Sequence, residues 1–276
     1  MANSRSYAER HASAAETFKA FAPDVEPQRI ADSFVRRQGA LGSFAFDVVG
    51  DMWSRPELPR RDRSLLVISV LAAQARDEEL VAHTRIGLRN GLSQTEIEEI
   101  LLHVAAYAGF PAAMASSRRI DEALREALGL EKLSDRTPAE QTSDEARDRD
   151  AADVLRTIAG AAGEIEPAQG LARMREMLGE VGVTAYRFAF GDVWARPQLS
   201  RRDRSIVVIA ILVSLGAVAE LEVHAPAGLR HGLSRVEVEE IVNHLALYAG
   251  IPRAVEAIRA VRAAWAKLDE AAASDV

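Results

Sequence analysis

The sequence contains no cysteine among its 276 residues. Disulfide bonds, thiol redox chemistry and cysteine-based metal sites are therefore excluded. It also has no glycine-rich phosphate loop, no GxSxG nucleophile elbow and no HExxH zinc motif. The candidates that remain for chemistry are histidine, arginine, tyrosine and carboxylate side chains.

Long hydrophobic runs and an excess of positive charge are also missing. No apolar run approaches the roughly 18 residues that a bilayer-spanning helix needs, and residues 1–21 lack the apolar core of a signal peptide. The net charge is −7, so no general positive field attracts nucleic acid or anionic lipid. Apolar residues make up 48% and charged residues 27%, which is typical of a soluble globular protein. We therefore expect a cytoplasmic protein that binds neither membranes nor nucleic acid.

What the sequence does contain is a long internal repeat. Residues 53–111 return as residues 194–252 at a constant offset of 141 positions without a gap, and 31 of the 59 aligned positions are identical. A period this long that occurs twice indicates a duplicated domain rather than a solenoid. Positions that both copies share are the first candidates for a common role.

The repeat predicts two domains, residues 1–128 and residues 150–276. Between them, residues 129–149 are polar, charged and interrupted by Pro138, as is typical of a linker. The cores of the two domains are predicted to be residues 53–125 and 194–266.

Each copy carries the sequence signals of helices. Residues 64–73 are apolar nearly all round, and a run of this length predicts a buried helix rather than a strand. Ser93 and Glu96 form a capping-box pattern that Ser234 and Glu237 repeat. No segment alternates apolar and polar residues between turn signals, so the predicted fold class is all-α.

Four of the six histidines occupy repeat positions, and an acid and a tyrosine accompany them at helical spacing. The histidines are His83, His103, His224 and His244; Glu79 and Glu220 precede His83 and His224 by four residues, and Tyr107 and Tyr248 follow His103 and His244 by four. A glutamate one helical turn before a histidine can accept its N–H and fix the tautomer. The alternative is that each histidine is a buried, hydrogen-bonded core residue.

An arginine cluster at residues 60–64 returns at residues 201–205. We interpret its beginning as a solvated helix start with Asp62 as the N-cap. Arg63 and Arg204 lie at the edge of the most apolar helix, where a guanidinium can bind a carboxylate of the protein or of a ligand. A metal site built from the acids and histidines matches no familiar spacing, so we expect no metal.

The motifs "WARPQLSRRDRS", "HAPAGLRHGLS" and "VEEIVNHLALYAGIP", with their first-copy partners, resemble the carboxymuconolactone decarboxylase family. The resemblance implies an all-helical fold and rings of six single-domain subunits, so a chain with two copies is expected to form a homotrimer. A related alkylhydroperoxidase-D-like branch carries a Cys-x-x-Cys pair where this chain has Arg76 and Glu79 in copy one, and Ala217 and Glu220 in copy two. Thiol peroxidase activity is therefore excluded.

The resemblance also implies an activity, the decarboxylation of a carboxymuconolactone-like unsaturated lactone acid in the breakdown of aromatic compounds. No cofactor is expected, because the lactone itself accepts the electrons. The implied roles are carboxylate binding by Arg63 or Arg204, proton delivery or oxyanion stabilisation by His83 or His224, orientation of these histidines by Glu79 and Glu220, and supporting contacts from His103, His244, Tyr107 and Tyr248.

Two other functions stay open. One is a proton-transfer enzyme, an isomerase or lyase, that acts on another unsaturated keto acid or lactone. The other is a non-catalytic helical oligomer that binds a small molecule. Pro226 in copy two replaces Arg85 of copy one, and a proline inside a helix removes a backbone hydrogen bond and bends it. We therefore expect His83 to be the principal group, with Glu79 orienting it, and the His224 site to be impaired.

Overall fold

The computed structural model describes residues 6–133, 138–139, 142–161 and 163–274. These described residues form helices joined by short turns, and no strand occurs among them, so the all-α prediction is confirmed. No helix in this part of the chain is long and apolar enough to cross a membrane. The chain divides into two compact units, and each is described by itself. The first ends at Arg63 and the second begins at Ser64.

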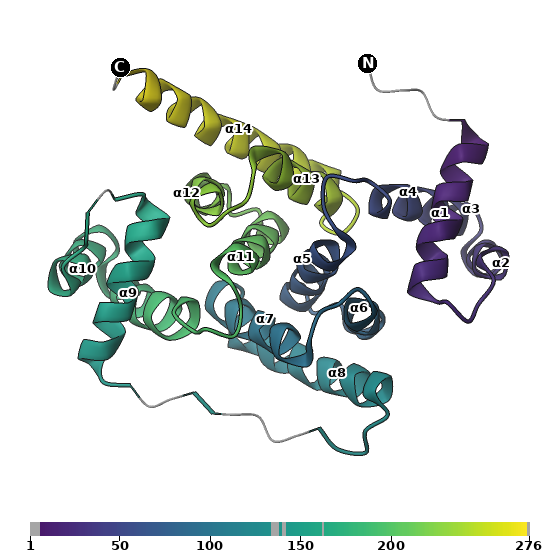
Figure 1. Cartoon of the computed structure of the whole chain (residues 1–276), viewed down its shortest axis with the longest axis horizontal. Coiled ribbons are helices and arrows are strands. Elements are labelled where there is room, and N and C mark those ends of the chain that lie inside the picture. Colours follow the sequence, from purple (N-terminus) through teal and green to yellow (C-terminus); the bar gives the residue numbers. More distant parts are fainter. Residues whose placement is uncertain (1–5, 134–137, 140–141, 162, 275–276) are drawn as a thin grey trace. The chain divides into compact units, whose positions relative to one another are not determined.

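The first unit is a small aromatic-centred helical cluster. Its elements are α1 (Tyr7–Phe21), α2 (Pro27–Gln38), α3 (Ala40–Phe44), the π-helical segment η1 (Ala45–Val49) and α4 (Gly50–Trp53) (Figure 1). The Phe18 ring stacks on Phe46 with centroids 4.7 Å apart, and Phe21 meets Trp53 edge-on at 4.8 Å. These buried rings hold α1 against η1 and α4.

Helix α5 (Arg60–Ala73) crosses the boundary between the units. The second unit then contains α6 (Asp77–Arg89), α7 (Gln94–Tyr107), α8 (Phe110–Leu128), α9 (Asp144–Ala159), α10 (Pro167–Thr184), the π-helical η2 (Ala185–Trp194), α11 (Arg201–Leu215), α12 (Val218–Arg230), α13 (Arg235–Leu245) and α14 (Ile251–Ser274). The predicted linker, 129–149, is too long at its end, because α9 already begins at Asp144.

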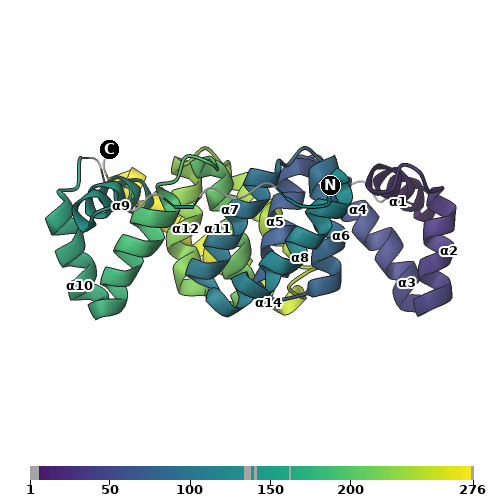
Figure 2. The same ribbon diagram turned by 90° about the horizontal axis from the view of Figure 1, so that it is seen from below.

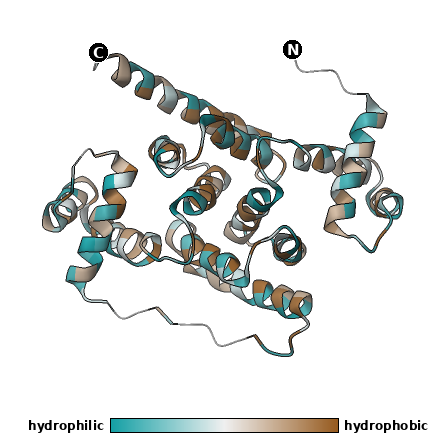
Figure 3. Ribbon diagram, in the orientation of Figure 1, coloured by the Kyte–Doolittle hydropathy of each residue, from teal (hydrophilic) through white to brown (hydrophobic). Residues whose placement is uncertain are grey.

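Helix α11 is the centre of the second unit. Its residues 203–214 are all buried, and it packs against α7, α12 and α13. Figure 3 shows hydrophobic residues gathered on α11 and the helices beside it. Residues 64–72 of α5 are buried in the same way. The two apolar runs of the repeat are thus buried helices, as their length predicted, because helices that are apolar on every side need cover all round.

At the helix N-termini, the two predicted capping boxes are confirmed, whereas the predicted N-cap at Asp62 is wrong. Both capping boxes form: the Ser93 backbone N–H donates to the Glu96 carboxylate at 2.7 Å, and Ser234 repeats the bond. Asp62, however, is not an N-cap, because α5 begins at Arg60 and leaves Asp62 buried in its first turn. In copy two the N-cap is Ser200.

Helices of both sequence repeats share the second unit. Helix α7 of the first copy packs against α11 and η2 of the second, and α9 packs against η2, α10 and α12 (Figure 2). Residues 129–149 therefore separate two sequence repeats, whereas the packed unit contains helices from both. This interleaving brings side chains that are far apart in the sequence into one place.

Candidate active site

Three polar residues, spaced one helical turn apart, lie on the face of α7 that is directed toward the second repeat. Glu99, His103 and Tyr107 follow at intervals of four, so they line one side of the helix. The second repeat supplies the facing groups, which are Trp194 from η2, Arg204 from α11 and His224 from α12. All six lie within the second unit.

Arg204 is fully buried, and its guanidinium is occupied by the protein. Nε donates to the Leu199 carbonyl at 3.0 Å, and Nη2 donates to the Arg196 carbonyl at 2.7 Å and to Glu99 Oε2 at 3.1 Å. Nη1 reaches His103 Nε2 at 2.9 Å. The sequence predicted that Arg204 binds a carboxylate of the protein or of a ligand, and the structure shows the protein carboxylate, that of Glu99. Arg204 therefore orients Glu99 and His103.

The contact with Arg204 fixes the tautomer of His103. A guanidinium can only donate, so Nε2 of His103 accepts and the neutral ring carries its proton on Nδ1. Burial, together with the charges of Arg204 and His224, holds the pKa of His103 well below its usual value. Its Nδ1 is buried without a hydrogen-bond partner among the described residues. A buried polar group without a partner is uncommon in a folded protein, and His103 itself does not line the cavity described below.

Tyr107 connects the two other rings of the site. Trp194 Nε1 donates to Tyr107 Oη at 2.9 Å, and the same oxygen lies 3.4 Å from His224 Nε2. Burial raises the pKa of Tyr107, so the phenol stays protonated. Burial, with a smaller effect of His231, lowers the pKa of His224 to about 4. The pair is therefore a neutral phenol beside a neutral imidazole at pH 7.

The glutamates that were predicted to orient the histidines do not do so through the expected bond. Glu220 is exposed on α12, and the described ring contacts of His224 are with Tyr107 and Trp194 instead. Glu79 is likewise exposed on α6. The spacing of four residues places each acid on the same side of the helix as its histidine. The acid is exposed, however, and the buried histidine ring contacts the tyrosine of the other repeat instead.

A second ring group repeats this geometry with the repeats exchanged. His83 of the first copy meets Tyr248 of the second edge-on at 5.5 Å, as His224 meets Tyr107 at 5.6 Å. Tyr248 stacks on His244 at 5.6 Å. Burial lowers the pKa of His83 to about 4. In both ring groups the histidine therefore faces the tyrosine of the other copy.

Arg63, the repeat counterpart of Arg204, is also fully buried. It lies in the first unit, where it donates to the Leu58 carbonyl at 3.2 Å and to the Arg55 carbonyl at 2.8 Å. These bonds match those of Arg204 to the carbonyls of Leu199 and Arg196. Both predicted carboxylate-binding arginines therefore anchor the turn that precedes their own helix.

Sequence reasoning missed three members of the site, Glu99, Trp194 and Arg196. Arg196 forms an ion pair with Glu99 at 2.8 Å, so one buried carboxylate meets two guanidinium groups. The available signal was recurrence at the offset of 141, since all three return in the other copy as Glu240, Trp53 and Arg55. Recurrence alone does not distinguish such residues from shared structural positions, and no spacing rule pairs Glu99 with residues 97 and 105 positions later.

Within the aligned repeat, His231 is the one histidine whose counterpart is a different residue, Asn90. The two His231 nitrogens contact Ser205 Oγ at 2.7 Å and Thr157 Oγ1 at 2.9 Å. Asn90 donates to Ser64 Oγ at 2.8 Å in the same way. His231 therefore joins α9, α11 and the end of α12 behind the site.

A cavity of about 650 Å³ lies between α9, α10, η2 and α12, which are neighbours in Figures 1 and 2. Tyr107 and His224 line it, and so does Glu220. Most of its other lining side chains are apolar. The predicted catalytic pair of the second copy thus borders a space that can hold a small molecule.

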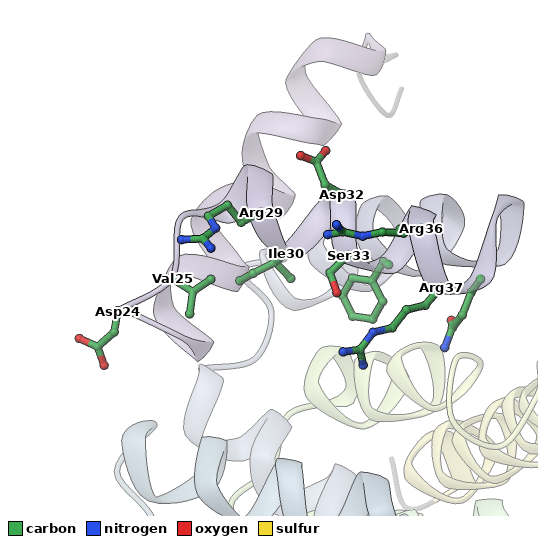
Figure 4. Close-up of a pocket in the computed structure, with 10 residues that line it drawn as sticks. Asp24, Val25, Arg29, Ile30, Asp32, Ser33, Arg36 and Arg37 are labelled. Carbon is green, nitrogen blue, oxygen red and sulfur yellow. The ribbon is translucent and has the colours of Figure 1, made fainter.

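A second hollow, of about 740 Å³, lies along α2 in the first unit and contains none of the predicted catalytic residues. Figure 4 shows Arg29, Arg36 and Arg37 on it together with Asp24 and Asp32. All five are exposed, as is usual for charged residues on a solvated helix. We therefore place the candidate active site at His224 and Tyr107. Among the described residues, no group of three or more potential metal ligands is present.

The fold and the site define an all-helical protein with two copies of one motif and a buried His–Tyr–Arg network between them. Residues 41–122 and 180–263 each match the carboxymuconolactone decarboxylase family, and together they make up more than half of the chain. The chain belongs to this family, as its motifs predicted.

Two curated proteins are similar to parts of the chain. A 4-carboxymuconolactone decarboxylase of Acinetobacter baylyi is 41% identical over 93 residues, which are 34% of this chain and 66% of that protein. A nitrosuccinic acid decarboxylase of Metarhizium robertsii is 35% identical over 71 residues, which are 26% of this chain and 50% of that protein. The matches thus span between half and two thirds of these relatives.

Proposed function

We propose that the protein is a cofactor-independent decarboxylase of an unsaturated lactone acid of the carboxymuconolactone kind. The observation that carries the proposal is the buried, neutral His224–Tyr107 pair at the wall of a cavity, in a member of a decarboxylase family. Both similar curated proteins are named decarboxylases. Their named substrates are acids with a group that can accept an electron pair, a lactone carbonyl or a nitro group.

The chemistry needs an electron sink, an oxyanion contact and a proton. The bond between the ring carbon and the carboxylate breaks, CO2 leaves, and the electron pair passes into the lactone carbonyl as an enolate. A proton then adds to carbon, so the carboxylate and one proton yield CO2 and the decarboxylated lactone. Apolar surroundings favour the step, because the leaving carboxylate is poorly solvated there.

The buried charges behind the rings support this chemistry. Arg196 and Arg204 share the single carboxylate of Glu99, which leaves one net positive charge next to His103. In a buried site such a charge attracts an anionic substrate and stabilises a developing oxyanion more strongly than it would in water. The Tyr107 hydroxyl, which lines the cavity, is the donor that we assign to the oxyanion, with His103 as a supporting group behind it.

We assign proton delivery to carbon to His224. Its pKa of about 4 describes the site without a ligand. A carboxylate placed beside the ring favours the charged imidazolium, so substrate binding raises the pKa and loads the proton that is later given up. Helix α12 continues through Pro226 to Arg230. We prefer His224 to His83 as the principal group, because His224 lines the cavity.

The test is to supply a 4-carboxymuconolactone-type acid and to measure CO2 release and loss of the carboxylate together. We expect one CO2 per substrate without added cofactor, and the same rate with EDTA. Substrate isomerisation without CO2 would instead support the proton-transfer alternative. Tight binding without any reaction would support the non-catalytic alternative.

We also propose that the chain assembles as a trimer, as the family resemblance implies. Each chain would contribute two copies of the repeat to a ring with sixfold pseudo-symmetry. Sedimentation equilibrium at micromolar concentrations measures this directly, and a species near 30.0 kDa would contradict the proposal.

A further inference from the structure

We propose that Arg173 of helix α10 binds the carboxylate that the substrate keeps after CO2 has left. This inference rests on the proposed function, because an acid of the carboxymuconolactone kind carries two carboxylates and loses only one of them. Arg173 lies outside the aligned repeat, so recurrence between the copies gave no signal for it. Its role would be to select diacids over monoacids.

One face of α10 forms part of the wall of the cavity beside His224. Gln169, Arg173 and Met177 follow at intervals of four residues, and all three line the cavity. Side chains at this spacing lie on the same side of a helix. The Arg173 side chain therefore borders the same space as Tyr107 and His224, which line the cavity from α7 and α12.

Arg173 is available to a ligand. Its side chain is exposed and forms no hydrogen bond or ion pair with another described residue. The two arginines that the sequence predicted for carboxylate binding are occupied instead, Arg63 by backbone carbonyls and Arg204 by backbone carbonyls and Glu99.

No other arginine or lysine is present among the described residues that line the cavity. A guanidinium can form two parallel, charge-assisted hydrogen bonds with one carboxylate. The acids on the wall, Glu164 and Glu220, repel a ligand carboxylate that is placed beside them. A dianionic ligand therefore gains most when one of its carboxylates lies at Arg173.

The chemistry decides which of the two carboxylates this is. An ion pair with the carboxylate that has to leave would stabilise the ground state more than the transition state and so would slow the loss of CO2. The other carboxylate does not change during the reaction, so its ion pair is kept throughout and contributes to binding alone. With that end held at Arg173, the leaving carboxylate belongs at Tyr107 and His224.

Binding can be measured without turnover with a saturated analogue of the lactone acid. Reduction of the ring double bond removes the path from the reacting carbon to the lactone carbonyl, so this analogue keeps both carboxylates and releases no CO2. The matched probe carries a methyl ester in place of the carboxylate that the substrate would keep. Isothermal titration calorimetry of the full chain should show the diacid binding at least about fivefold more tightly than the ester.

Two substitutions on α10 locate the effect. Arg173→Gln removes the charge at the cavity, while Arg175→Gln removes the same charge from an exposed arginine of the same helix that pairs with Glu180 and is not among the described lining residues. We expect Arg173→Gln to weaken diacid binding at least about fivefold and ester binding less than about twofold. Arg175→Gln should change both by less than about twofold, and circular dichroism checks that both variants are folded.

The contrary results are distinct. Equal losses for the diacid and the ester in Arg173→Gln, or equal effects of the two substitutions, would overturn the inference, and so would failure of the native chain to bind the diacid. If binding follows the expected pattern but no lactone acid releases CO2, the proposed function fails and the carboxylate site stands. If CO2 is released and Arg173→Gln has the KM of the native chain, the proposed function stands and the assignment of Arg173 is wrong.

Discussion

Tyr107 and Tyr248 occupy equivalent positions of the two repeats, yet the backbone around them differs. Helix α7 continues as far as Tyr107, whereas α13 ends at Leu245 and leaves Tyr248 in the following turn. Even so, each tyrosine meets the histidine of the opposite repeat at nearly the same ring distance, 5.6 and 5.5 Å. The comparison shows that the two copies preserve the placement of the rings more closely than the helix that carries them.

The segments before residues 53 and 194 make a similar point, although their sequences diverge. Gly39 and Gly179 both turn the chain with a positive φ, of 59° and 62°. A Cβ on Gly42 or on Gly182 would lie about 2 Å from a backbone oxygen of the preceding helix, so only glycine fits either place. The offset of these glycines is 140 rather than 141, so copy two has one more residue before its tryptophan, and both copies contain a π-helical segment in this stretch.

The largest expected difference between the repeats concerns catalysis. His224→Ala should lower kcat/KM for the lactone acid by at least about 100-fold, the usual contribution of a general acid or base. His83→Ala should lower it less than about tenfold if the His224 site is the principal one. Steady-state kinetics on both variants, with unfolding curves to confirm the fold, makes the comparison.

The reverse order of the two effects would restore the ranking that the sequence suggested, with His83 as the principal group. Equal losses would mean that both ring groups work. Tyr107→Phe provides a finer version of the test, because it keeps the ring contact with His224 but removes the hydroxyl that Trp194 and His224 share.

The next effect is on stability. Arg204→Met should cost about 3–5 kcal/mol of unfolding free energy, because it removes one of the two guanidinium partners of the buried Glu99 and leaves the carbonyls of Leu199 and Arg196 without their donor. The neighbouring Arg201 forms a partly exposed ion pair with Asp153, so Arg201→Met should cost less than about 1 kcal/mol. Urea unfolding measures both. Similar midpoints for the two variants would show that the Arg204 network contributes little.

A smaller difference concerns pH. Burial, then the charges of Arg201 and Arg230, lower the pKa of His231 to about 4 from its usual 6.5. Between these values the unfolded chain binds a proton that the folded chain does not, so stability is full above pH 6.5 and falls as the pH decreases toward 4. His231→Asn introduces the residue of copy one and should flatten this dependence by up to about 1.4 kcal/mol per pH unit. An unchanged slope between pH 6.5 and 4 would contradict the assignment.

The smallest difference lies at the end of the apolar helix of each copy. Ala75 has a φ of 51°, a left-handed conformation that its counterpart Gly216 adopts freely with a φ of 73°. Ala75→Gly should therefore raise stability by up to about 1 kcal/mol, and Gly216→Ala should lower it by a similar amount. Differential scanning calorimetry detects both shifts in stability. A destabilised Ala75→Gly variant would contradict the assignment of backbone strain to Ala75.

The sequence was sufficient for the helices and not for the site. The apolar run at 64–73 and the capping boxes depend on neighbouring residues, so periodicity and spacing predicted them. The pairing of Tyr107 with His224 depends on how two repeats pack, and no local rule contains that information. The same limit explains the error at Glu220, where the helical spacing to His224 is real but the histidine lies buried against another helix.

The division of the site between the repeats changes what duplication makes possible. In a ring of identical subunits every substitution enters all sites at once, whereas in a fused chain Pro226 can arise opposite Arg85 and alter one half alone. Yet a change at Tyr107 in the first half is felt at His224 in the second. The two halves of the gene are thereby free to specialise but not to drift apart, since each encodes the partner of the other.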